Sequence, residues 1–342
     1  MSEFNKNDHL DCVLKSHSIK LDSGSLLDNY RAKRNKVKEA LDKEFSDKII
    51  KTINSGSYAK HTAINTKFDM DLCNHFKKGS FDKLQDMYDA VYKFLNEDFD
   101  DDDIIYVREQ KVSIGLKFNV DGEDILFDVT PGRQLNDAKE DNDIYLYIND
   151  ETDANRTKTN IHKQIEKIQG RHKERENIKL LKVWKSHHFK VKSFLVELLV
   201  MKAYDKEKIE DVKDLWERLK KVIEFIRDNI ETVTLIDPGN SGNNVAKSLT
   251  DDEKKDFKKE MANILDEVEK DSTQLKHFFP INSKYADCDN TQSNSQSQSS
   301  KLLGLLTSAV AIADKSAFTD NQGRVTTDSR FVKNQPHKFH GE

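Results

Sequence analysis

The chain has 342 residues, of which 36% are hydrophobic and 34% charged, and its formal net charge at pH 7 is −5. This length is enough for two lobes, and the composition is typical of a soluble protein with a modest core. The negative net charge argues against a long nucleic acid as partner, although local basic clusters can still bind phosphates. The longest apolar run, Leu302–Ala313, is interrupted by polar residues and is too short to cross a bilayer, so no membrane partner is expected.

The three cysteines, Cys12, Cys73 and Cys288, lack Cys-x-x-Cys spacing. Their spacing argues against a zinc site and a disulfide framework, and it fits a reducing compartment. The first residues lack the pattern of a signal peptide, so none is expected. We therefore expect a cytoplasmic protein.

The first segments along the chain are a polar stretch and a helical pattern. Residues 1–24 are polar and are expected to be flexible. From Ser25 to Ile53, apolar residues recur near helical spacing and predict one long helix that braces the two lobes.

The stretch Ser55–Cys73, SGSYAKHTAINTKFDMDLC, carries the strongest functional signal. Gly56 allows the backbone to approach a ligand, and the amides of Gly56, Ser57 and Tyr58 open a helical turn of the kind that binds anions. A strand is predicted to follow, with Asp69 and Asp71 on one face, because residues two apart in a strand point the same way. Two adjacent carboxylates repel each other unless a cation lies between them, and Mg²⁺ favours such oxygen ligands.

A third acid, Asp128, lies in the apolar strand pattern EDILFDVT. A buried aspartate without a partner is costly, and a metal shared with Asp69 and Asp71 would supply that partner. Asp124 is the alternative on the same strand face, but it follows the turn Asp121-Gly122 and is explained by solvent at the strand end.

The region around these acids predicts a mixed sheet with helices, within a lobe over residues 25–150. Ser80 is expected to cap a helix over Phe81–Asn96, and Glu97–Asp103 is expected to be a solvated acidic loop. Strands over Val112–Val120 and Glu123–Val129 are predicted to form a hairpin, and Pro131-Gly132 is expected to end the second strand.

The remaining chain predicts a helical lobe over residues 151–282 without strands. Ser193–Tyr204 is nearly all apolar and is expected to be its central helix, and Thr250 with Glu253 predicts a capping box. Residues 283–342 include the low-complexity stretch NTQSNSQSQSS and are expected to be a disordered tail.

The pattern of Gly56-Ser57, Asp69-x-Asp71 and a later Asp128 resembles the nucleotidyltransferase superfamily of polymerase-β type, and within it the bacterial relatives of cyclic GMP-AMP synthase and oligoadenylate synthetase. The resemblance runs through most of residues 25–280. It implies an α+β fold in which a nucleotidyltransferase lobe and a helical lobe flank a central cleft.

The resemblance also assigns nucleotide-binding roles in the second lobe. It implies that Lys182 grips phosphate, that Ser193 lies at the triphosphate, and that Asp237 belongs to a loop bordering the nucleotide. Each has a plain alternative from the sequence: a lysine on the protein surface for Lys182, a helix cap for Ser193, and a turn held by Asx side chains for Asp237.

The implied reaction is nucleotidyl transfer with two Mg²⁺ ions, or Mn²⁺ in their place, held by Asp69, Asp71 and Asp128. The substrates would be ATP and other nucleoside triphosphates, and the product a cyclic di- or trinucleotide second messenger in bacterial antiphage signalling. The tail would bind a regulatory protein. Alternatives are a nucleotidyltransferase that modifies a protein or small molecule, an RNA-tailing enzyme, and a catalytically silent nucleotide-binding scaffold.

Overall fold

The computed structural model describes residues 4–19, 26–136, 142–150, 155–285, 318–319, 325–326 and 332–333. The chain divides into two compact units, Met1–Lys284 and Tyr285–Glu342. The first unit contains every residue that the sequence nominates for function. In the second unit, the described residues form a sheet of three short strands, which are β10 (Phe318–Thr319), β11 (Val325–Thr326) and β12 (Val332–Lys333).

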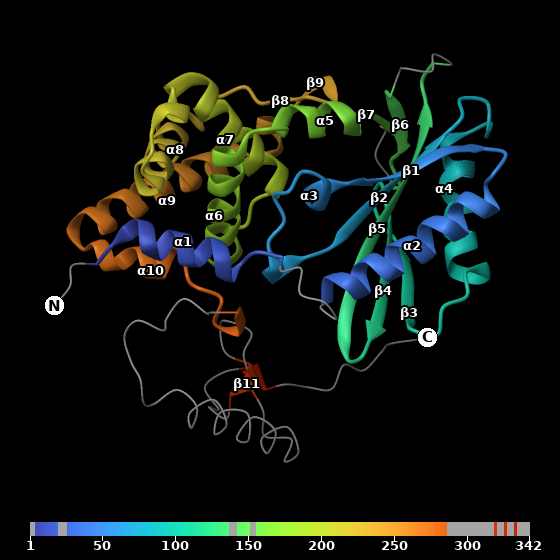
Figure 1. The fold of residues 1–342 in the computed structure, drawn as a ribbon. Helices are drawn as coiled ribbons and strands as arrows, with labels where there is room; N and C mark the ends of the chain where they lie inside the picture. Colours follow the sequence, from blue (N-terminus) through green and yellow to red (C-terminus); the bar gives the residue numbers. More distant parts are fainter. Residues whose placement is uncertain are drawn as a thin grey trace. The chain divides into compact units, whose positions relative to one another are not determined.

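A seven-stranded mixed sheet is the frame of the first unit (Figure 1). Its main path runs β1–β2–β5–β4–β3, and β6 and β7 continue from β5. Among the described pairs of this sheet, β2 and β5 run parallel and the others antiparallel. The strands are β1 (Ile49–Ser55), β2 (Met70–Phe76), β3 (Ile104–Glu109), β4 (Ile114–Val120), β5 (Glu123–Gln134), β6 (Ile144–Tyr147) and β7 (Arg156–Thr159).

Two helices, α2 (Leu26–Glu44) and α4 (Leu84–Lys93), share one hydrophobic core with this sheet. Alternation along β2 explains the division of its side chains, because Met70 and Leu72 are buried in that core while Asp71 points to the other face. The apolar side of each strand therefore fixes which side remains for polar residues.

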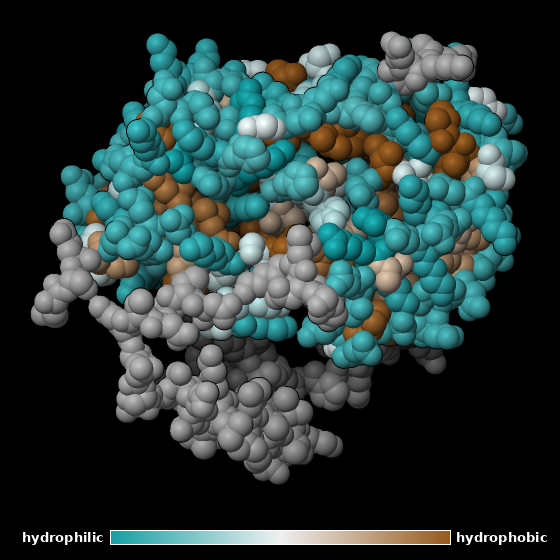
Figure 2. Space-filling view, in the orientation of Figure 1, coloured by the Kyte–Doolittle hydropathy of each residue, from teal (hydrophilic) through white to brown (hydrophobic). Residues whose placement is uncertain are grey.

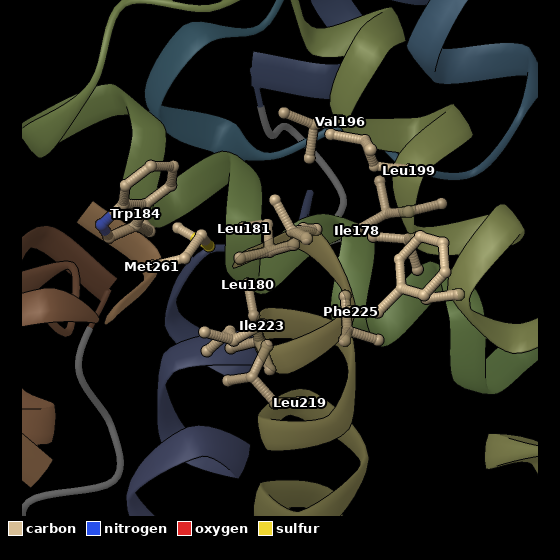
Figure 3. Close-up of a cluster of buried hydrophobic side chains, with 14 of the residues drawn as sticks. Ile178, Leu180, Leu181, Trp184, Val196, Leu199, Leu219, Ile223, Phe225 and Met261 are labelled. Carbon is tan, nitrogen blue, oxygen red and sulfur yellow. The ribbon is translucent and has the colours of Figure 1, made fainter. Parts of the chain in front are cut away.

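The helical part of the unit is built around α7, which contains the predicted apolar stretch Ser193–Tyr204 and continues to Glu207. Figure 3 shows part of its core, to which α6 contributes Ile178 and Leu181, α7 contributes Val196 and Leu199, and α8 contributes Leu219 and Ile223. Trp184 stacks on Phe257 with ring centroids 5.6 Å apart. The helices of this part are α1 (Lys6–Ser16), α5 (Ile161–Ile168), α6 (His172–His188), α7 (Ser193–Glu207), α8 (Leu215–Asn229), α9 (Asp251–Lys270) and α10 (Leu275–Phe278).

Short 3₁₀ and π turns connect these elements. They are η1 (Asn65–Lys67), η2 (Phe94–Asp98), η3 (Ile209–Asp211), η4 (Val245–Ser248), η5 (Ser272–Gln274) and η6 (Ser283–Tyr285).

The prediction that residues 1–24 are flexible is wrong for the part that the structure describes, which forms α1. Asn5 caps α1, whose Leu10 and Val13 are fully buried in the helical core, and His9 Nε2 lies 2.9 Å from the carbonyl oxygen of Phe279. Burial against the helical part stabilises this segment, although its sequence is mostly polar. Residues 1–3 and 20–25 lie outside the described residues.

Several predicted boundaries in the sheet region are also wrong. The long helix ends at Glu44, and β1 replaces its last turns. Strand β5 runs past Pro131 to Gln134, since Gly132 pairs with both β2 and β6. The helix predicted over Phe81–Asn96 is α4, which begins at Leu84 with Lys83, not Ser80, as its N-cap.

The acidic loop and the helical lobe each depart from expectation. Asp101 is buried and accepts from Lys33 Nζ at 2.5 Å, so Glu97–Asp103 is only partly solvated. Strand β7 carries the sheet past the predicted boundary at residue 150, and a two-stranded sheet of β8 (Ile236–Asp237) and β9 (Asn240–Asn244) lies among the helices.

Other expectations about the chain have mixed outcomes. The capping box of Thr250 and Glu253 is confirmed. Cys73 is a buried free thiol, and Cys288 lies outside the described residues. The low-complexity stretch at 290–300 and the apolar run at 302–313 lie outside the described residues. Within the described part of the chain, no helix has both the length and the apolar character that a bilayer crossing requires.

Candidate active site

The turn after β1 is built directly over a carboxylate. Gly56 opens α3 (Gly56–Ala59) with a φ of +58°, a left-handed conformation that favours glycine. A Cβ atom on Gly56 would lie 1.7 Å from Asp71 Oδ2. Ser55 pairs with Asp71 across β1 and β2, so the ladder holds the turn and the acid together. Any other residue at position 56 would displace the carboxylate.

Three aspartates meet where β2 and β5 run in parallel. Asp71 and Asp128 are direct partners in the register of the two strands, and Asp69 comes one residue before β2. Burial raises the pKa of all three carboxyl groups, and that of Asp71 rises to about 7 because Asp69 and Asp128 add their repulsion to its desolvation. The competing acid Asp124 is exposed and pairs with Lys117 Nζ at 2.7 Å. The choice of Asp128 over Asp124 therefore agrees with this geometry.

Two cavities adjoin the three acids, one of about 360 Å³ that Asp71 lines and a smaller, second cavity of about 220 Å³. Asp128 faces the second cavity, which Asp69 also lines. Gln110 Nε2 donates to Asp128 Oδ1 at 2.9 Å and orients this carboxylate. Tyr106, Arg108 and Leu126 also line this cavity. Asp69 lines both cavities and therefore lies where the second cavity adjoins the 360 Å³ cavity that Asp71 lines.

The donor set fits a hard divalent cation. Among the described residues, no hydrogen bond or ion pair reaches the Asp71 carboxylate, although Lys60 and Lys182 act on it at longer range. No group of three or more acidic, histidine or cysteine side chains in the described part of the chain is already gathered as a metal cluster. Since Gln110 holds Asp128 toward the second cavity, the expected closed set of three ligands is not preformed. Oxygen donors with raised pKa values and no counter-charge in contact are nevertheless what Mg²⁺ or Mn²⁺ would bind.

A cavity of about 360 Å³ brings most of the nominated residues together. It is lined by the turn, by two of the acids and by the helical part of the unit. The predicted residues in its wall are Gly56, Ser57, Asp69, Asp71, Lys182 and Ser193. Asp128 is the strand partner of Asp71 but does not line this cavity, because its side chain faces the second cavity.

Ser193 and Asp237 have different outcomes. Ser193 is the first residue of α7, where Lys192 is the N-cap, so the alternative that Ser193 caps the helix is wrong. Asp237 does not line the cavity. Its carboxylate accepts from Gly239 N at 2.8 Å and from Gln164 Nε2 at 3.0 Å, as expected for a residue that holds its own turn. The structure therefore does not bring Asp237 to the site.

Lys182 lies in the cavity wall but is almost fully buried. Its ammonium donates to Thr62 O at 3.1 Å, to Thr62 Oγ1 at 3.0 Å and to Glu197 Oε1 at 2.6 Å. The surface alternative is therefore wrong, and Lys182 also has no donor left for phosphate in this conformation. Lys60, Thr62 and Glu197 were not nominated from the sequence. Glu197 could have been, because an isolated acid in the apolar run SFLVELLV is the same signal that identified Asp128.

A larger cavity of about 590 Å³ borders α3, with Arg31, Tyr58 and Lys179 among its described lining residues. It contains none of the nominated residues, and no carboxylate is among its described lining. Its size alone gives it no part in the chemistry of the three acids. Figure 2 shows that the described part of the visible face of the molecule is mostly hydrophilic, with hydrophobic residues exposed in patches.

Residues 9–172 match the family described as Second Messenger Oligonucleotide or Dinucleotide Synthetase domain, abbreviated SMODS. Residues 9–172 are therefore similar to a SMODS domain. This match confirms the resemblance drawn from the sequence, and it spans Gly56, Asp69, Asp71 and Asp128 but ends before Lys182 and Ser193. No curated protein matched the chain.

Solved structures extend the likeness of the SMODS domain to the helical part. E. coli MS115-1 CdnC, solved with ATP, is 20% identical with a TM-score of 0.64, over 83% of this chain and 99% of CdnC. The same CdnC in complex with HORMA-deltaN is 19% identical with a TM-score of 0.61, over 82% of this chain and 98% of that chain. Elizabethkingia meningoseptica CdnE cyclic dinucleotide synthase, solved with GTP and Apcpp, is 16% identical with a TM-score of 0.56, over 77% of this chain and 99% of that chain. At these identities the likeness shows the fold, so the predicted α+β fold of a mixed-sheet lobe followed by a helical region is confirmed.

Proposed function

We propose that this chain is a metal-dependent nucleotidyltransferase that joins nucleoside triphosphates into a cyclic di- or trinucleotide second messenger. The observation that carries the proposal is the pairing of Asp71 with Asp128, beside Asp69 and beneath the Gly56 turn, inside the region similar to a SMODS domain. Buried acids that lack a counter-charge in contact destabilise a fold, so their retention is explained by a ligand that they bind.

The triphosphate of the first nucleotide would occupy the cavity that contains Asp71, against the backbone of Gly56 and the hydroxyls of Ser57 and Ser193. Asp69 and Asp71 would hold the divalent ion, with Asp128 completing the set once a second nucleotide is bound. When bound, Mg²⁺ or Mn²⁺ supplies charge neutralisation for the leaving pyrophosphate and lowers the pKa of a ribose hydroxyl.

The second nucleotide would use the cavity that contains Asp128. Tyr106 and Leu126 offer apolar surface for a base, and Gln110 and Arg108 offer donors beside the acid. The ribose hydroxyl oxygen would attack the α-phosphorus and lose its proton, while the bond from that phosphorus to pyrophosphate breaks. A second such step, within the linked product, closes a ring.

ATP and other nucleoside triphosphates are the proposed substrates, and the proposed setting is cytoplasmic antiphage signalling. CdnC has been solved with ATP and with a HORMA protein. By analogy, we propose a regulatory protein partner that binds the tail at residues 283–342.

The test is to incubate the purified chain with radiolabelled ATP and GTP and Mg²⁺, and then to treat the products with phosphatase. A resistant nucleotide whose mass matches a ring supports the proposal, and Asp69→Asn with Asp71→Asn should abolish it. Label transferred to a protein or small molecule favours the modifying enzyme, and binding without product favours the silent scaffold. Product formation by the double variant contradicts the metal assignment.

A further inference from the structure

Two lysines and a glutamate form a buried network between the sheet part and the helical part of the first unit. Lys60 follows α3, Lys182 lies on α6, and Glu197 lies on α7. All three side chains are more than nine-tenths buried. Lys60 Nζ donates to Glu197 Oε2, and Lys182 Nζ donates to Glu197 Oε1 at 2.6 Å. The two cations and one anion leave one net positive charge in the wall of the cavity.

The two lysines differ in the donors that remain to them. All three protons of the Lys182 ammonium have acceptors, two on Thr62 and one on Glu197. The Lys60 ammonium has one hydrogen bond within the described part of the chain, to Glu197, and lies 5.0 Å from the ring centroid of Phe194. Two donors on Lys60 are therefore available in a cavity that also contains Asp71.

Lys182 connects the helical part to the Gly56 turn through Thr62. The Thr62 hydroxyl donates to Glu197 Oε1 at 2.9 Å, and the Thr62 amide donates to Ser57 O at 3.0 Å. His61, between Lys60 and Thr62, has a φ of +57°, so these contacts hold a left-handed backbone in place. Any change in Lys182 or Glu197 is thereby transmitted to Ser57.

We propose that Lys60, rather than Lys182, donates to the β- and γ-phosphates of the bound nucleotide, and that Glu197 is a positioning residue that aims Lys60 while it holds Lys182 and Thr62 together. This inference rests on the proposed function, because it assigns the triphosphate to the cavity of Asp71. Lys182 then joins the two parts of the unit and does not contact substrate.

The test compares binding of α,β-methylene-ATP with binding of AMP, both with Mg²⁺, by calorimetry. Lys60→Met should weaken binding of the triphosphate analogue roughly 10- to 100-fold, since it removes charge-assisted hydrogen bonds, and AMP binding by less than about threefold. Lys182→Met should weaken binding of both ligands by a similar factor. Lys179→Met is the matched control one turn earlier on α6, outside this cavity, and should change neither.

Thermal unfolding supplies a readout that does not depend on ligand. Removing one partner of a buried ion pair should lower Tm by about 10 °C in Lys182→Met and in Glu197→Gln, and the double variant should lose much less than the sum. Glu197→Gln should in addition lose part of the preference for triphosphate over AMP, which a purely structural role would not change.

The outcomes separate this inference from the proposed function. If wild type binds the triphosphate analogue no better than AMP, the proposed function is wrong. If wild type has the preference but Lys182→Met abolishes it and Lys60→Met keeps it, the assignment of Lys60 is wrong. Additive Tm losses for Lys182→Met and Glu197→Gln would overturn the positioning role of Glu197, whatever the ligand data show.

Discussion

Replacing Gly56 with alanine should abolish activity without unfolding the protein. The new Cβ would lie 1.7 Å from Asp71 Oδ2, half the 3.4 Å at which ordinary contacts begin. The carboxylate must withdraw by more than an ångström, and a displacement of about 1 Å at a reacting centre can cost roughly 100-fold in rate. We therefore expect at least a loss of about 100-fold in the initial rate of pyrophosphate release.

The stability cost of this substitution should be modest. A left-handed non-glycine residue costs roughly 1–2 kcal/mol, and an off-rotamer Asp71 side chain about 1 kcal/mol more. The sum, roughly 2–3 kcal/mol, is below the 5–15 kcal/mol typical of a folded domain, so the variant should remain folded at 25 °C.

Gly122→Ala is the matched control. Gly122 also has a positive φ, +84°, but a Cβ atom there would have no neighbour within 4 Å. It should show the backbone cost alone, roughly 1–2 kcal/mol by denaturant unfolding, with activity near wild type. If Gly56→Ala is as active as Gly122→Ala, the turn does not determine the position of Asp71 and the reasoning fails.

Three further predictions concern charge, chemistry and packing. The pKa of Asp71 is raised to about 7 from an ordinary 3.8, so the folded state binds this proton more tightly and, in EDTA, stability should fall as pH rises from about 4 to 7. Asp71→Asn should therefore melt above wild type at pH 8, and Mg²⁺ should raise the Tm of wild type alone; a variant that melts lower at pH 8 would contradict this. Asp128→Asn should lose at least about 100-fold in rate while ATP binding changes by less than about threefold, because Asp128 faces the second cavity; equal loss of both would place Asp128 at the first nucleotide instead. Leu10→Ala should destabilise the chain by about 3 kcal/mol in urea unfolding and the exposed Asp11→Ala by less than about 0.5 kcal/mol, whereas equal effects would mean that α1 is not docked.

The proximity of the three acids could be predicted from the sequence because their signal is local. An alternating D-x-D at the start of an apolar strand fixes the face of Asp69 and Asp71, and an acid inside an apolar strand marks Asp128. The same signal is present at Glu197, but the apolar run around it indicates a core helix so strongly that the acid inside it is easily overlooked.

Other elements depend on contacts that periodicity does not report. The segment at Ile49–Ser55 continues the helical spacing of the preceding residues, although its β-branched residues favour a strand. The polar helix α1 is fixed by packing of Leu10 and Val13 on distant helices. Whether Lys182 has a free donor depends on Thr62, which is 120 positions away in the sequence.

The parallel pairing of β2 with β5 also decides how the site tolerates change. A slip of two residues between these strands would carry Asp71 about 6–7 Å from Asp128, so the backbone ladder sets the spacing of the two carboxylates more firmly than any side-chain contact does. The helix α4 and the turn between β4 and β5 lie between the two strands in the chain but are not part of that pairing. Lengthening the chain at the β4–β5 turn would therefore leave the pairing of Asp71 with Asp128 intact, and so the far end of this hairpin is free to vary in length.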